Sequence, residues 1–75
     1  MQQRIDDAGT CDLIVNGQCL TLQARTLADV LERLGLGGSA VVAEVNGLIV
    51  QRESFTQTSL RNGDTIELVR FVGGG

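Results

Sequence analysis

The residues best suited to chemistry are the last three, Gly73, Gly74 and Gly75, which end the sequence in a backbone carboxylate. Glycine has no Cβ, so these residues leave the terminal carbonyl open and can take backbone angles closed to other residues. A fully extended segment from Val72 to Gly75 would reach roughly 13 Å, at about 3.3 Å per residue. We therefore expect the Gly75 carboxylate to enter a partner's active site while the folded body stays outside.

The rest of the composition offers little catalytic chemistry. The sequence has no histidine, which removes the commonest general base and the commonest metal ligand together. Its two cysteines, Cys11 and Cys19, do not have the spacing of a zinc site. The net charge is -3 and the arginines are scattered, so no basic patch is available for nucleic acid. We expect a protein that is not an enzyme, binds no cofactor or metal stably and does not bind nucleic acid.

The basic residues are six arginines, without a lysine. A guanidinium stays protonated and is a poor nucleophile, whereas a lysine amine would trap an activated acyl group. A general preference for arginine over lysine would explain the missing lysines equally well. Whatever its cause, the absence of lysine counts against a modifier that builds chains on its own lysines.

Length and hydropathy indicate one small globular domain. The chain has 75 residues, of which 43% are hydrophobic, and no apolar run approaches membrane-spanning length or forms a signal core. We expect a cytoplasmic protein without a membrane partner that is a monomer when free. The expected division is a flexible N-terminal extension over residues 1–10, a folded domain over 11–72 and a reactive tail over 73–75.

A hairpin is predicted around Asn16-Gly17, the strongest short-range signal for a two-residue turn. Val15 should then pair with Gln18, and Leu13 with Leu20. Strand alternation places one set of side chains on the core face: Leu13, Val15, Leu20 and Leu22. Cys11 has the parity of that face and Cys19 the opposite parity, so the two thiols should not bridge.

A short helix is predicted after Thr26, because apolar residues follow at helical spacing, at positions 27, 30, 31 and 34. Thr26 is a good N-cap, and Asp29, three residues on, is a weaker substitute for the Glu or Gln of a capping box. Gly35 suits a left-handed C-cap, with Leu36 placed to touch Leu31.

The second half of the sequence predicts two more strands and a final strand. Residues 41–45 form a strand that turns at Asn46-Gly47 into the strand 48–50, with Val41, Ala43 and Val45 facing inward. Residues 53–61 are irregular, anchored by Phe55 and Leu60, and residues 62–64 form a turn. The last strand covers 65–71; alternation buries Ile66 and Leu68 and turns Glu67, Val69 and Phe71 outward.

This order predicts an α+β fold, a mixed sheet of about five strands packed on one main helix with a flexible glycine tail. It resembles the ubiquitin-like β-grasp fold, whose reactive end lies where this chain has its terminal glycines. The closer resemblance is to the ThiS family of sulfur carriers in thiamin biosynthesis. The matching residues follow in order: Asn16, the helix start 26–31, the segment 46–52, Leu60, the segment 63–68 and Gly74-Gly75. Gln51 and Phe55 stand where family members often have Pro and Trp, the chain begins about ten residues early, and Gly73 is a third glycine.

The resemblance implies that Gly75, preceded by Gly74, carries sulfur as a terminal thiocarboxylate. ATP and Mg²⁺ would be supplied by a separate E1-like adenylating enzyme of the ThiF type. Sulfur would come from a desulfurase pathway and pass to a thiazole synthase of the ThiG type. We expect Val69, Phe71, Val72 and Gly73 to contact these partners.

Three alternatives stay open on the sequence. The small subunit of molybdopterin synthase uses the same terminal group for another acceptor. A ubiquitin-like modifier would join its carboxylate to target lysines, and an adaptor would leave the tail inert.

Overall fold

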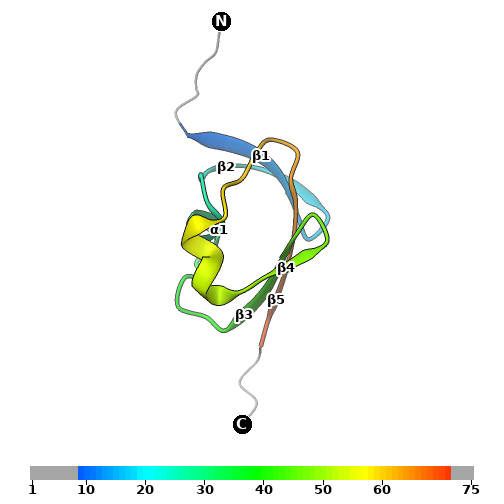
Figure 1. Cartoon of the computed structure of the whole chain (residues 1–75). Helices are drawn as coiled ribbons and strands as arrows, with labels where there is room; N and C mark the ends of the chain where they lie inside the picture. The colour runs from blue at the N-terminus through cyan, green and yellow to red at the C-terminus, as the bar shows by residue number, and fades with distance from the viewer. Residues whose placement is uncertain (1–8, 72–75) are drawn as a thin grey trace, which may run out of the picture.

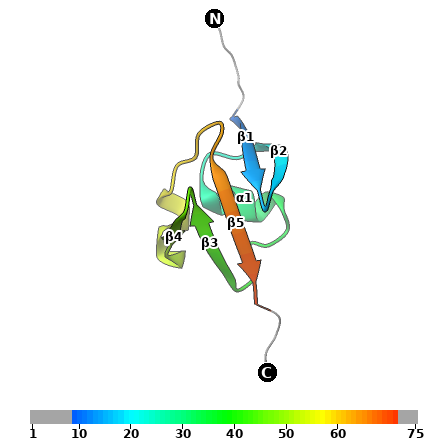
Figure 2. The same cartoon turned by 90° about the vertical axis from the view of Figure 1, so that its right-hand side faces the viewer.

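The computed structural model describes residues 9–71 and shows a five-stranded sheet with one main helix (Figure 1). The elements in chain order are β1 (Thr10–Val15), β2 (Gln18–Gln23), α1 (Leu27–Arg33), β3 (Val41–Val45), β4 (Leu48–Val50), the 3-10 helix η1 (Arg52–Gln57) and β5 (Thr65–Arg70). Helix α1 covers one face of the sheet and the other face is open (Figure 2). The predicted α+β fold is confirmed. Residues 1–8 and 72–75 lie outside the described range, and with them most of the predicted extension and the whole glycine tail.

The sheet is mixed, with strand order β2-β1-β5-β3-β4. The last strand, β5, is therefore central, parallel to β1 and antiparallel to β3. Its pairing with β1 covers two residue pairs, Ile14 with Thr65 and Val15 with Ile66. Its pairing with β3 is longer and runs from Val45 opposite Ile66 to Val41 opposite Arg70.

Both Asn-Gly pairs form the tight turns predicted for them. Asn16 and Asn46 have φ of 49° and 52°, and the glycines that follow have φ of 83° and 85°. Two successive positive φ angles are typical of the two-residue turn that matches strand twist. The β1–β2 register is the predicted one, with Val15 opposite Gln18 and Leu13 opposite Leu20.

Strand β1 begins at Thr10, which pairs with Gln23. Thr10 thus belongs to the sheet, although the sequence assigned residues up to 10 to the extension. The pairing extends because Ala24 N donates to Gly9 O at 3.0 Å, which closes the open end of the hairpin.

Helix α1 has the caps predicted for it. Thr26 Oγ1 accepts from Asp29 N at 3.2 Å, and Asp29 Oδ2 accepts from Thr26 N at 3.1 Å, which completes a capping box. At the other end Leu36 N donates to Leu31 O at 2.7 Å while Gly35 takes φ of 76°, the geometry of a Schellman cap. The helix therefore begins and ends where its local sequence requires.

The core lies between α1 and the inner face of the sheet. Its centre is formed by side chains with at most 1% of their surface exposed: Leu13, Leu27, Val30, Ala43 and Ile66. Leu20, Leu22, Leu34 and Val45 pack against this core and are half-buried. No helix within residues 9–71 has the length and apolar character needed to cross a membrane.

Two further features differ from the prediction. The segment predicted to be irregular, residues 53–61, overlaps η1, where Ser54 N donates to Gln51 O at 2.8 Å and Thr58 Oγ1 donates to Ser54 O at 2.7 Å. These local bonds satisfy the backbone while Phe55 is buried in the core, and Leu60 is buried as predicted. Strand β5 ends at Arg70, one residue earlier than predicted, although Phe71 N still donates to Ala40 O at 3.0 Å.

Candidate functional site: the outer sheet face beside the C-terminal segment

Strand β5 is the central strand of the sheet, and in the sequence it is followed by Phe71 and by residues 72–75, which we call the C-terminal segment. Ile66 and Leu68 on this strand are buried, and Val69 and Phe71 are 58% and 61% exposed. The predicted alternation is therefore confirmed, and Phe71 does not cover the edge of the core. Two of the predicted partner-contacting residues thus lie on the open face. The others, Val72 and Gly73, and the predicted reactive residues Gly74 and Gly75, lie outside the described residues.

The structure adds apolar residues to this face that the sequence prediction missed. Val42 lies directly opposite Val69 in the β3–β5 register and is 36% exposed. Ile49 on β4 is 64% exposed and pairs with Glu44, the next outward residue of β3. Alternation within β3 and β4 indicates that both point outward, but the sequence does not give the register that brings Val42 to Val69. We call Val42, Ile49, Val69 and Phe71 the outer apolar patch.

Acidic side chains border the patch. Glu44 and Glu67 are direct partners across β3 and β5, one step along the strands from Val42 and Val69. Like charges directly opposite each other on adjacent strands oppose folding, so their juxtaposition has no benefit in the free sheet. Across the sheet, Glu44 lies between Glu67 and the patch residue Ile49, so the face combines apolar side chains with two carboxylates.

The two turn asparagines fix β5 in place. Asn16 Oδ1 accepts from Leu68 N at 2.8 Å, and Asn16 Nδ2 donates to Leu68 O at 3.3 Å. Asn46 Oδ1 accepts from Thr65 N at 2.9 Å, and Asn46 Nδ2 donates to Asp64 Oδ1 at 3.0 Å. Each amide thus bonds to the strand that ends at the C-terminal segment. The sequence pointed to these residues as turn formers, and their side-chain contacts required the fold.

Neither of the two cysteines belongs to the outer apolar patch. Cys11 is buried and Cys19 is exposed, as the strand parity predicted, and both are free. Burial raises the pKa of the Cys11 thiol, and the negative charges of Asp64 and Asp12 raise it further. Cys11 therefore stays a protonated core residue.

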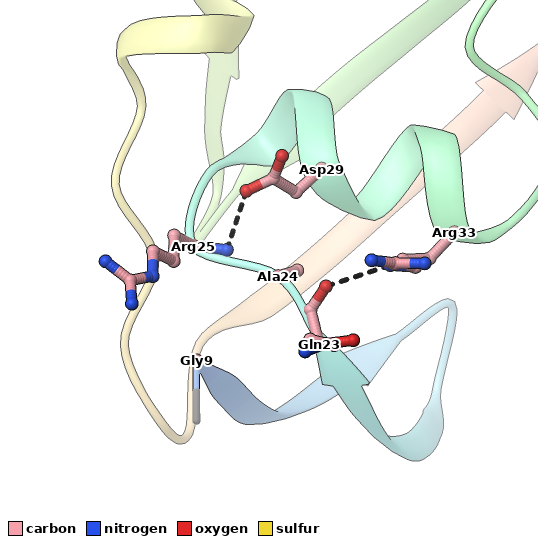
Figure 3. A pocket seen from close by; sticks show the side chains of 6 residues that line it. All are labelled: Gly9, Gln23, Ala24, Arg25, Asp29 and Arg33. Atoms are coloured by element: carbon pink, nitrogen blue, oxygen red, sulfur yellow. Dashed lines mark hydrogen bonds between the residues drawn. The ribbon is translucent and has the colours of Figure 1, made fainter. Parts of the chain in front are cut away.

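A hollow of about 250 Å³ lies at the start of α1, between the end of β2 and the helix (Figure 3). Asp29 Oδ2 accepts from Arg25 N at 2.9 Å, and Arg33 Nε donates to Gln23 O at 3.0 Å. The two guanidinium groups point in different directions in Figure 3, so they do not converge on a ligand. Within residues 9–71, His, Cys, Asp and Glu side chains do not gather in threes to form a metal site.

The five-stranded mixed sheet packed on one main helix defines the class: a small α+β protein with the β-grasp fold. The ThiS family model matches residues 13–75. The structure is similar to the thiamine biosynthesis protein ThiS of Geobacter metallireducens, with a TM-score of 0.71, 32% identity and coverage of 85% of this chain and 99% of that chain.

Two proteins are similar to this chain in sequence. The sulfur carrier protein ThiS of Bacillus subtilis (strain 168) is 38% identical over 50 residues, which cover 67% of this chain and 76% of that protein. A thiazole synthase of Paramagnetospirillum magneticum (strain ATCC 700264 / AMB-1) is 36% identical over 64 residues. That match covers 84% of this chain but 20% of the synthase, so this chain spans a fifth of that relative. The chain belongs to the ThiS family, the sulfur carrier proteins of thiamine biosynthesis.

Proposed function

We propose that this chain carries sulfur for thiazole formation as a thiocarboxylate on Gly75. Membership of the ThiS family supports the proposal most directly, because the family match extends through the terminal Gly-Gly. The exposed positions of Val69 and Phe71 add support, since they leave an uncovered apolar surface on the strand that precedes the reactive end. In this proposal the protein is a co-substrate of partner enzymes and not itself a catalyst.

The proposed chemistry begins with activation of the carboxylate. A carboxylate with an ordinary pKa of about 3.5 is ionised at neutral pH and resists nucleophilic attack. A separate E1-like enzyme of the ThiF type, which binds ATP and Mg²⁺, would let a Gly75 oxygen attack the α-phosphorus of ATP and release pyrophosphate. The acyl-adenylate that results is an electrophile.

Sulfur then replaces AMP. The terminal sulfur of a cysteine-derived persulfide attacks the Gly75 acyl carbon and expels AMP, and a thiol reduces the resulting acyl disulfide to the thiocarboxylate. A thiazole synthase of the ThiG type would accept this sulfur, and the released carboxylate could be activated again. The similarity of this chain to a region of a thiazole synthase supports that partner.

The outer apolar patch is the proposed docking face for the adenylating enzyme. Its four members are exposed on the face that α1 leaves open, and Val69 and Phe71 lie nearest the C-terminal segment. Small apolar areas of this kind next to a reactive group commonly mark a binding site. Docking there would bring Gly75 to the enzyme while the core stays folded.

The test is mass spectrometry of the chain after incubation with a ThiF-type enzyme, ATP, Mg²⁺ and a persulfide donor. Replacement of oxygen by sulfur should add about 16 Da to the intact protein. Deletion of Gly75, or addition of one residue after it, should abolish both AMP transfer and the mass gain while circular dichroism shows the same fold. Unchanged adenylation of either variant would refute a role for the Gly75 carboxylate. Sulfur transfer to a ThiG-type synthase, and not to molybdopterin synthase, would assign the acceptor.

A further inference from the structure

The backbone of β5 faces different neighbours at alternate residues. Thr65 O accepts from Asn46 N at 2.7 Å and Phe71 N donates to Ala40 O at 3.0 Å, so odd-numbered residues bond toward β3. Asp64 O and Ile66 O accept from Ile14 N and Asn16 N at 3.0 and 2.9 Å, so even-numbered residues bond toward β1. This alternation is general for strands with a neighbour on each side.

The pairing toward β1 stops halfway along β5. Strand β1 ends at Val15. The side-chain amide of the next residue, Asn16, then hydrogen-bonds to both the N–H and the C=O of Leu68. The next residue on this side is Arg70. Among residues 9–71 its N–H and C=O have no hydrogen-bond partner, and Figure 2 shows the second half of β5 without a strand on that side. Arg70 therefore forms a short edge of the sheet without a neighbouring strand. In the sequence it lies between Leu68, whose backbone groups are bonded to Asn16, and the C-terminal segment.

Resting on the proposed function, we propose that an extended segment of the adenylating enzyme pairs with this edge. The segment accepts from Arg70 N and donates to Arg70 O, adding a short strand to the sheet. The hydrogen bonds of Asn16 set where this pairing begins, because they occupy the backbone N–H and C=O of Leu68.

Arg70 favours a different protein as the occupant over a second copy of this chain. Two copies pairing through the same short edge would bring their Arg70 guanidinium groups together, and like charges across a strand pair are unfavourable. The edge also adjoins the outer apolar patch, since Val69 and Phe71 flank Arg70 in the sequence. A partner that covers the patch is thus already beside the edge.

Amide hydrogen exchange tests the pairing in the unmodified protein. In the free protein the Arg70 amide should exchange fast, while the Leu68 amide, bonded to Asn16 Oδ1, should be protected. In the complex with a ThiF-type enzyme, Arg70 exchange should slow by at least about tenfold, with Leu68 as the internal control. A complex that adenylates Gly75 but leaves Arg70 exchange unchanged overturns the inference and leaves the proposed function intact. Failure of the complete system to adenylate Gly75 refutes the proposed function itself.

A pair of variants separates the backbone of Arg70 from its side chain. Arg70→Pro removes the N–H, which makes no bond to β3, and proline is tolerated where the N–H faces away from the sheet. Arg70→Ala removes the side chain alone and is the matched control. We expect Arg70→Pro to bind the enzyme about tenfold more weakly than Arg70→Ala, because one acceptor on the enzyme is left unpaired. Equal affinities overturn the inference. Protection of Arg70 at high protein concentration without enzyme also overturns it, since a second copy would then be the occupant.

Discussion

The side-chain amide of Asn16 holds both backbone groups of Leu68, with its Oδ1 2.8 Å from Leu68 N and its Nδ2 3.3 Å from Leu68 O. Asn16 is the first turn residue after β1, with φ of 49°, and Leu68 is the buried residue in the middle of β5. One residue thus forms the turn and extends the β1–β5 ladder beyond the last backbone pair. The arrangement fixes the strand that precedes the proposed reactive end.

Replacing Asn16 by Gly should lower the free energy of unfolding by about 1 to 2 kcal/mol, since two partly buried hydrogen bonds are lost. Glycine keeps the positive φ, so the loss reports the amide and not strain in the turn. Asn16→Asp is the matched variant, because it keeps an acceptor for Leu68 N and lacks the donor to Leu68 O. Urea unfolding should rank the wild type first, Asn16→Asp second and Asn16→Gly last. Equal midpoints would show that the amide adds no stability.

Charge placed in the outer apolar patch should weaken binding to the adenylating enzyme and leave the fold stable. Val69→Asp and Phe71→Asp should each cost about 1 kcal/mol or more in binding free energy, as expected for interface anchors. Val42→Asp should behave in the same way, because Val42 lies opposite Val69. Binding calorimetry and thermal unfolding of each variant measure the two effects separately.

Leu48→Asp is the control for these substitutions. Leu48 is 73% exposed but pairs with Val45, near the start of β5 and away from the C-terminal segment. Its substitution should leave affinity unchanged. A large drop in melting temperature with unchanged affinity for Val69→Asp or Phe71→Asp would assign these residues to the folding core.

The helix and the outer sheet face should respond differently to truncation. Leu31 is 5% exposed and packs α1 onto the sheet, so Leu31→Ala should cost about 2 to 4 kcal/mol of unfolding free energy. Such a loss is large beside the total stability of about 5 to 15 kcal/mol that native proteins generally have. Ile14 is half-buried on the outer face, and Ile14→Ala should cost much less. A denaturant series with Ile14 as the more sensitive position would contradict the assigned core face.

The capping carboxylate predicts a pH dependence of stability. Backbone N–H groups of Arg25 and Thr26 donate to Asp29 and lower its pKa in the folded state. A lowered folded pKa stabilises the protein fully above the unfolded value, about 3.9, and this contribution is lost as the pH falls through the folded pKa. Asp29→Asn should therefore be less stable than wild type at pH 7, and the difference should shrink below about pH 4. A difference in stability between Asp29→Asn and the wild type that is the same at every pH would show that the charge of Asp29 does not contribute to stability.

The sequence by itself determined the local structure. The Asn16-Gly17 turn, the Thr26–Asp29 capping box and the Gly35 C-cap depend on groups a few residues apart, so composition and spacing were enough to predict them. Strand alternation likewise assigned Val69 and Phe71 to the outer face. The family resemblance likewise rested on short motifs in their order, from Asn16 and the helix start 26–31 to Gly74-Gly75.

The tertiary structure decided which distant segments meet. Burial of Leu13, Val30 and Ile66 in one core brings β5 between β1 and β3, and that register sets Val42 against Val69. The 52-residue separation between Asn16 and Leu68 puts their contact beyond any local pattern. The open edge at Arg70 follows from where β1 stops beside β5. Such features depend on the packing of the whole core, because no short-range interaction fixes the pairing of strands far apart in the chain.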